Sequence, residues 1–158
     1  MATSPEATKA PPSRSQIVVG VDGSESSLEA LRWARELAKR SDAGIEVIAA
    51  WQWPAGWAAG WTGGWSPQTD AQTSADDAVL TVFGERQPDR VTINVEQGTP
   101  AACLVEASKT AIMIILGSRG HGGFAGLLLG SVSSAVAEHS DCPVLVVHGN
   151  TLGDFAMT

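Results

Sequence analysis

The sequence predicts an α/β fold in which strands and helices alternate around one parallel sheet. Short apolar runs rich in β-branched residues recur along the chain, as is typical of strands buried on both faces. Segments with the 3.6-residue periodicity of amphipathic helices separate these runs. Right-handed β-α-β crossovers then place helices on both faces of the sheet, and 158 residues are enough for one such domain.

The first strand and helix form the most clearly marked unit. Residues 16–21, QIVVGV, read as a buried strand that is followed directly by Asp22. The helix predicted over 26–40 has leucines and alanines along one face. Ser26 and Glu29 have the S-x-x-E spacing of a capping box, so Ser26 is expected to cap this helix.

The later elements continue the alternation. Thr99 followed by Pro100 predicts an N-cap with proline at the first helical position. Alternating apolar residues over 90–98 predict an edge strand with one wetter face. The predicted strands are 44–50, 90–98, 111–116 and 143–148, and the predicted helices are 74–87, 100–109 and 131–140.

Charge and cysteine content narrow the partners and the compartment. The net charge is −7, and the ten Lys and Arg residues are spread singly, so neither nucleic acid nor an anionic membrane is an expected partner. No apolar run reaches the ~20 residues of a membrane-spanning helix. Cys103 and Cys142 lie in apolar segments without metal-ligand spacing, which favours small buried thiols in a reducing cytoplasm.

Composition also divides the chain into a domain and two tails. Residues 1–14 are rich in Pro, Ser and Thr and have no apolar core, so a disordered tail is expected and not a secretory signal. The domain is expected over 15–149, with a C-terminal tail at 150–158.

Residues 51–67 are rich in tryptophan and glycine, and the stretch WQWPAGWAAGWTGGW holds five of the six tryptophans. Pro54 and the glycines oppose a helix, so an irregular loop is expected. Three interpretations stay open. Trp51 or Trp53 packs beside a ligand with the remaining indoles as a lid, the indoles form a surface for a protein partner, or the loop folds back onto its own domain.

A glycine-rich loop, GSRGHGGFAGLLLGSVSS (117–134), follows the fourth predicted strand. Glycines allow backbone N–H groups to approach an anion closely. Gly130 and Ser131 open the next helix, whose N-terminus adds about half a positive charge. In parallel sheets, ligands bind beyond the carboxyl ends of strands where the strand order reverses. The loop therefore predicts a phosphate site.

Other phosphate motifs fit this loop less well. A Walker loop requires a lysine, and none occurs in 110–158. The stretch GHGGFA (120–125) matches G-x-G-x-x-A, but it does not join a strand tightly to a helix as a dinucleotide motif does. A merely flexible linker would not explain why Ser131 stands at a helix start.

Three stretches resemble the universal stress protein family, in its ATP-binding branch: VVGVDGSESSLEALRWA, GTPAACLVEAS and GSRGHGGFAGLLLGSVSSAVAEHSDCPVLVV. The pattern of that branch is G-x2-G-x9-G-[ST], and Gly117, Gly120, Gly130 and Ser131 fall on it without a gap. The resemblance covers about 16–148 and implies a Rossmann-like three-layer domain with a five-stranded sheet in the order 3-2-1-4-5. The tryptophan-rich segment and both tails depart from the family pattern.

The resemblance also implies which residues bind the nucleotide. Asp22 would hold the adenosine, the backbone of Ala50 would recognise adenine, and the glycine loop would cradle ribose and phosphates. The implied positions are Gly20, Asp22, Ala50, Leu116, Gly117, Ser118, Arg119, Gly120, His121, Gly122, Gly123, Gly130, Ser131 and Val132.

Four of these side chains have simpler alternative roles. Asp22 could serve only the turn into the helix, and Ser131 could act only as an N-cap. Arg119 could contact phosphates or be a solvated surface residue. His121 could contact phosphate or be an exposed loop residue without function.

The sequence thus predicts an ATP-binding protein, with Mg²⁺ accompanying ATP, that acts as a nucleotide-dependent sensor in stress response. Phosphoryl transfer needs converging Lys, Arg and Mg²⁺, so hydrolysis is expected to be slow at most. AMP or cyclic-nucleotide binding, a slow ATPase or phosphotransferase, and a nucleotide-independent scaffold that uses the tryptophans remain alternatives. The last strand is expected to pair across a homodimer interface, as the resemblance implies.

Overall fold

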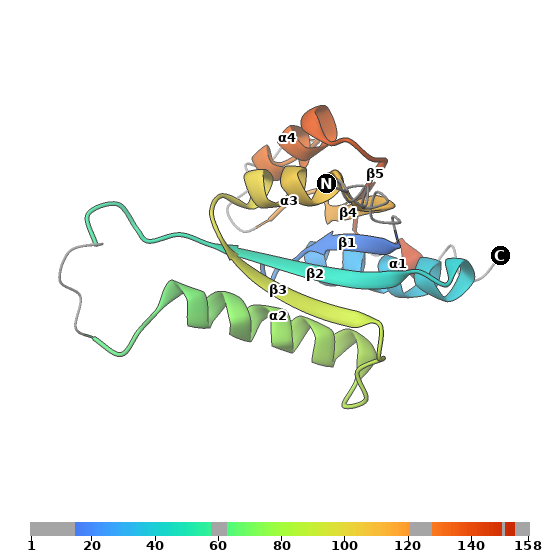
Figure 1. Cartoon of the computed structure of the whole chain (residues 1–158), viewed down its shortest axis with the longest axis horizontal. Coiled ribbons are helices and arrows are strands. Elements are labelled where there is room, and N and C mark those ends of the chain that lie inside the picture. The colour runs from blue at the N-terminus through green and yellow to red at the C-terminus, as the bar shows by residue number, and fades with distance from the viewer. Residues whose placement is uncertain (1–14, 58–62, 121–127, 150, 154–158) are drawn as a thin grey trace, which may run out of the picture.

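Five parallel strands form the sheet in the order β3-β2-β1-β4-β5, and helices cover both of its faces (Figure 1). The computed structural model describes residues 15–57, 63–120, 128–149 and 151–153. This arrangement confirms the predicted α/β class, the three layers and the strand order. The elements are β1 (Gln16–Gly20), α1 (Glu25–Ser41), β2 (Gly44–Trp51), α2 (Pro67–Phe83), β3 (Val91–Gln97), α3 (Pro100–Ser108), β4 (Met113–Gly117), α4 (Ser131–His139) and β5 (Val144–Val147).

The two faces of the sheet carry separate apolar cores. Successive strand residues point to opposite faces, so Val19 and Val47 pack with α1 and α2. Val18 and Ile48 pack instead with α3 and α4. Figure 1 shows α3 and α4 above the sheet and α2 below it. The sheet is therefore covered on both faces, as its continuous apolar strands require.

A gap opens at the carboxyl end of the sheet because neighbouring strands differ in length. The last paired residue of β1, Gly20, stands opposite Ile48, whereas β2 continues to Trp51. On its other side β1 pairs with β4, so the chain order reverses between β1 and β4. Open parallel sheets bind their ligands at such a reversal.

The predicted capping box at Ser26 is wrong, because the chain turns two residues earlier. Gly23 has a φ of 81°, and Asp22 Oδ1 accepts a hydrogen bond from Ser24 N at 2.9 Å. The N-cap is Ser24, whose hydroxyl accepts from Ser27 N at 3.3 Å. Glu29 is buried instead and pairs with Arg32 at 3.1 Å.

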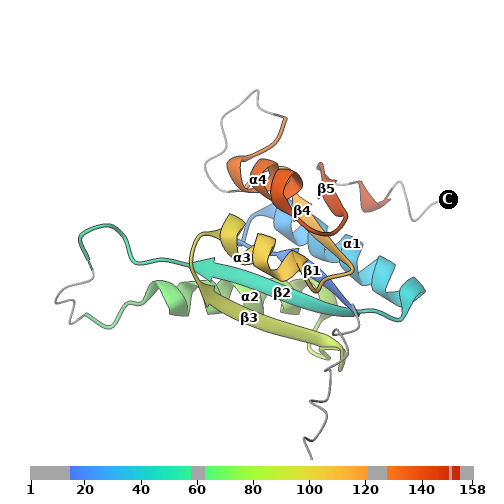
Figure 2. The same cartoon turned by 45° about the horizontal axis from the view of Figure 1, so that its top comes forward.

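Helix α2 begins at Pro67 and not at Ser74 as predicted. Its first two turns are polar, so they lack the apolar periodicity on which the prediction relied, but proline at the start is favourable for a helix. The helix ends before Gly84, which has a φ of 77°. The connection between β2 and α2 is therefore 52–66, since Trp51 belongs to β2 and Pro67 to α2. Figures 1 and 2 show its described parts extending beyond the sheet.

The described part of the predicted C-terminal tail contacts α1. Trp33 Nε1 donates to Thr151 Oγ1 at 3.2 Å, and Leu152 N donates to the Glu29 carboxylate at 2.8 Å. Leu152 itself is buried. Residues 151–153 are thus attached to the domain, whereas residues 1–14 lie outside the described part of the chain.

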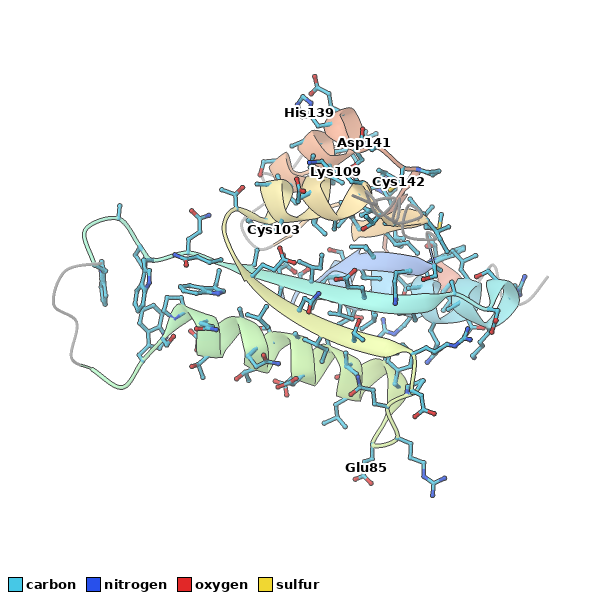
Figure 3. The ribbon with its side chains drawn as sticks, in the orientation of Figure 1. Glu85, Cys103, Lys109, His139, Asp141 and Cys142 are labelled. Carbon is cyan, nitrogen blue, oxygen red and sulfur yellow. The ribbon has the colours of Figure 1, made fainter. Side chains whose placement is uncertain are left out.

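Both cysteines lie on the α3 and α4 side of the sheet (Figure 3). Neither forms a disulfide within the described ranges. Burial raises the pKa of the Cys103 thiol, which keeps the thiol protonated at neutral pH. A search of the same ranges for a helix of membrane-spanning length and apolarity finds none.

Candidate ligand-binding site

A cavity of about 880 Å³ occupies the gap at the carboxyl end of the sheet. Its volume lies in the upper part of the range of small-molecule sites, roughly 300–1,000 Å³. Ten of the residues predicted from the sequence line it: Gly20, Asp22, Ala50, Leu116, Gly117, Arg119, Gly120, Gly130, Ser131 and Val132. Residues from β1, β2, β4 and the start of α4 therefore meet at one cavity, whereas His121, Gly122 and Gly123 lie outside the described ranges.

Ser118 is buried and does not belong to the described lining of the cavity. Its N–H donates to Val147 O at 2.8 Å. Its carbonyl accepts from Gly130 N at 2.7 Å and from Ser133 Oγ at 3.1 Å. Ser118 thus joins the end of β4 to the start of α4, which brings Gly117 and Gly130 to the same cavity.

Hydrogen bonds also join the β1–α1 turn to the segment after β4. Ser26 Oγ donates to the carbonyl of Arg119. Asp22 accepts from Ser24 in the turn, and its carboxylate stands beside Gly120. Asp22 therefore has the turn role and also lines the cavity, so the two roles proposed for it are compatible.

Three cavity glycines lie in close contact with the folded chain, and at Gly117 the contact is with the main chain. A Cβ at Gly20 would lie 2.7 Å from Leu116 Cδ2, and a Cβ at Gly117 would lie 2.7 Å from the carbonyl carbon of Ser26. A Cβ at Gly120 would overlap the Asp22 carboxylate. These glycines allow the segment after β4 to pack directly against the β1–α1 turn.

Gly130 differs from the other three glycines. Its φ and ψ are −74° and 172°, which any residue adopts. The nearest atom to a Cβ at this position is Ser118 O at 3.4 Å, an ordinary contact. The described protein therefore does not require glycine at 130, although the residue lines the cavity.

The N-terminus of α4 opens into the cavity. Its N-cap is Gly130, and no side chain within the described ranges caps the helix. Ser131, Val132, Ser133 and Ser134 line the cavity. Uncapped N–H groups and the positive end of the helix dipole make this helix start a suitable anion site.

The backbone of Ala50 faces the space that β1 leaves. Ile48 O accepts from Val21 N at 2.9 Å, so Ile48 turns its peptide groups toward β1. Ala50 lies two residues further along β2, so its N–H and C=O are also directed toward the β1 side. No main-chain hydrogen bond to β1 forms there in the described ranges, because β1 ends at Gly20. One N–H donor and one C=O acceptor thus point into the cavity.

Helix α2 and the tryptophan-rich segment add a wall that the prediction did not include in full. Trp51 lines the cavity, whereas Trp53 does not. Trp65 also lines it, and its Nε1 donates to Asp70 Oδ2 at 2.7 Å. The missed lining residues of this wall are Trp65, Pro67, Asp70, Ala71 and Ser74, and the unrecognised first turns of α2 account for Pro67, Asp70 and Ala71.

The indoles pack in edge-to-face pairs. The ring centroids of Trp51 and Trp53 are 5.9 Å apart, and those of Trp57 and Trp65 are 5.8 Å apart. Such pairs are stabilising beyond the area that they bury. Trp53, Trp57 and Trp65 nevertheless remain 37–44% exposed. The described indoles of the segment are thus partly packed on one another and partly in solvent.

The strand order and the helix layers define a doubly wound α/β domain, with a candidate ligand site in the cavity at the reversal. More narrowly, the chain belongs to the universal stress protein family, whose model matches residues 14–148.

Named relatives and solved structures agree with this membership. A universal stress protein of Mycolicibacterium smegmatis is 37% identical over 137 residues, covering 85% of this chain and 46% of the relative. The chain thus spans about half the length of the curated relatives it matches. UspA from Lactobacillus plantarum has a TM-score of 0.68 at 19% identity, covering 85% of this chain and 98% of its own.

A second solved structure carries a nucleotide. It is a universal stress protein in complex with cAMP, 30% identical, with a TM-score of 0.60 and coverage of 86% of this chain and 98% of its own. The likeness to UspA concerns the fold alone, whereas this likeness also extends to sequence.

Proposed function

We propose that this universal stress protein binds ATP in the cavity at the carboxyl end of its sheet and acts as a nucleotide-dependent regulator in stress response. One observation supports this proposal above the others. Gly130 is a glycine that the described fold does not need, placed at an uncapped helix start in the cavity wall. A phosphate at α4 accounts for the absence of a side chain there.

The remaining contacts follow from the lining of the cavity. Phosphates lie against the start of α4 and the glycines after β4, beside Arg119. Adenine, which has donors and acceptors on one edge, meets the backbone N–H and C=O of Ala50. Asp22 lies between the two and accepts from a ribose hydroxyl. Mg²⁺ enters with the triphosphate.

Cyclic AMP is the second candidate ligand, because the solved relative at 30% identity contains it. Backbone N–H groups at a helix start bind a phosphate group but do not distinguish ligands by their number of phosphates. Arg119 favours ATP, since it adds a positive charge beside the space for the phosphate chain.

We also propose that the domain binds nucleotide and hydrolyses it slowly at most. The charged side chains of the described lining are Asp22, Asp70 and Arg119. Rapid phosphoryl transfer relies on several cationic groups around the γ-phosphate.

The two thiols outside disulfides agree with the proposed cytoplasmic location.

Calorimetric titration with ATP, ADP, AMP and cyclic AMP, with and without Mg²⁺, tests the proposed ligand. ATP is expected to bind most tightly. Asp22→Asn is expected to weaken ATP binding by about tenfold, because the ribose hydroxyl would then donate to a neutral amide oxygen instead of a carboxylate. The matched control is Asp77→Asn, an exposed α2 residue outside the described lining. A native protein that binds none of the four nucleotides would contradict the proposal.

We further propose a homodimer through the outer edge of β5, which pairs only with β4 among the described strands. The carbonyls of Pro143 and Val147 accept hydrogen bonds from β4 and the residue after it, so the peptide groups of Val144 and Val146 face outward. An uncovered edge of this kind pairs readily with a second chain.

Val146→Pro removes an outward N–H group and leaves the pairing with β4 intact. Sedimentation velocity is expected to show a dimer for the native protein and for Val146→Thr, and a monomer for Val146→Pro. A native protein that sediments as a monomer, or a proline variant that remains dimeric, would argue against this interface.

A further inference from the structure

The cavity is lined from both faces of the sheet, and the proposed ATP contacts leave its α2 wall unused. Trp51 has the same strand parity as Val47 and Ala49, which belong to the core under α1 and α2. Trp65, Asp70 and Ser74 line the cavity from the same side. Leu116 and Val132 line it from the α3 and α4 side. We call the part lined by Trp51, Trp65 and Asp70 the α2 arm, and the part lined by Ala50 and the start of α4 the ATP arm.

The walls of the α2 arm are held in place from outside the cavity. The Trp65 indole is fixed by its hydrogen bond to Asp70, at 2.7 Å, and by edge-to-face packing on Trp57. Trp51 packs in the same way on Trp53. Trp53 and Trp57 do not line the cavity themselves. Each lining indole is thus backed by a second indole, which positions it without occupying the space.

The two arms differ in the chemistry that they favour. Asp70 lies in the first turn of α2, where its negative charge offsets the positive end of the helix dipole. The same carboxylate repels phosphate. Indole faces suit a planar ring, as in proteins that stack nucleic-acid bases on aromatic side chains. A carboxylate that already accepts one hydrogen bond has further lone pairs for the amino group of such a ring.

We propose that the α2 arm, formed by Trp51, Trp65 and Asp70, is a subsite for a second planar base. The full ligand is then an adenine dinucleotide, in which two nucleosides are joined through phosphates. This inference depends on the proposed function, since one adenosine and the phosphates occupy the ATP arm. The volume of about 880 Å³, in the upper part of the range of small-molecule sites, agrees with a ligand of this size.

Calorimetry with diadenosine tetraphosphate, adenosine tetraphosphate and ATP tests the subsite. The first two probes carry four phosphates and differ only in the second adenosine. We expect diadenosine tetraphosphate to bind at least tenfold more tightly than adenosine tetraphosphate. Trp65→Ala should remove that tenfold difference, because one base–aromatic stack is lost, and should change ATP binding by less than twofold.

Two further variants separate stacking from hydrogen bonding. Trp65→Phe keeps an aromatic ring and should retain most of the preference for diadenosine tetraphosphate over adenosine tetraphosphate. Asp70→Asn removes the negative charge and should reduce that preference. Leu80→Ala, an exposed apolar residue of α2 outside the cavity, is the control and should change nothing.

The outcomes distinguish this inference from the proposed function. If ATP binds but the second adenosine adds no affinity, the subsite is refuted and the ATP site stands. If Trp65→Ala weakens ATP and diadenosine tetraphosphate equally, the indole borders the mononucleotide and the second subsite is again refuted. If none of the three probes binds, the proposed function itself has failed.

Discussion

Gly130→Asp is expected to bind ATP about 100-fold more weakly than the native protein, while its melting temperature stays the same or rises. Aspartate is a favoured N-cap, and α4 begins without a side-chain cap, so the helix gains a hydrogen bond. The same carboxylate would stand where the phosphates are proposed to bind. Like charges in close contact cost several kcal/mol, and each 1.4 kcal/mol corresponds to about a factor of ten in affinity.

Thermal unfolding and calorimetry of the same preparations measure the two effects of Gly130→Asp. The control is Gly64→Asp, which adds the same charge at a position where no atom lies within 4 Å of a new Cβ. This control should bind ATP like the native protein. A Gly130→Asp variant that retains native affinity would show that phosphate does not bind at α4.

Gly117→Ala is expected to lower the free energy of unfolding by about 1–3 kcal/mol, the usual cost of excess volume in a packed interior. The new methyl group would lie 2.7 Å from the carbonyl carbon of Ser26, so the main chain of α1 or β4 must move. ATP binding should weaken as well, because both segments line the cavity.

Denaturant unfolding of Gly117→Ala and Gly130→Ala provides a direct comparison. Both glycines belong to the same sequence motif, yet only the first is confined by its own chain. Gly130→Ala should therefore stay within about 0.5 kcal/mol of the native protein, as is typical of substitutions without a steric conflict. Equal stability of the two variants would contradict the distinction between the glycines.

Strand and helix types could be predicted from the sequence because burial on both faces leaves a strong pattern. The short apolar runs of β1 and β4 are typical of strands that are buried on both faces. The N-cap at Thr99 was also predicted correctly, since Thr99 Oγ1 accepts from Ala102 N at 3.2 Å. Both features depend on residues close together in the chain.

Long-range contacts could not be predicted in the same way. The capping box at Ser26 and Glu29 matched a local rule, but the Glu29 carboxylate accepts from Leu152 N instead, 123 positions further along. Likewise, the polar start of α2 gave no helical periodicity, so Asp70 and its bond to Trp65 were missed. Of the candidate site, the glycines and Asp22 were recognisable from a motif, whereas the α2 wall was not.

The hydrogen bonds of Ser118 affect which insertions the sequence can accept near this site. The carbonyl of Ser118 accepts from Gly130 N, so the two ends of the segment 119–129 are held next to each other. The N–H of Ser118 donates to Val147 O, which fixes this point to β5. Doubling the length of a closed segment costs only about 0.6 kcal/mol in closure entropy. Insertions between Arg119 and Leu129 would therefore leave Gly117 and Gly130 in place at the cavity.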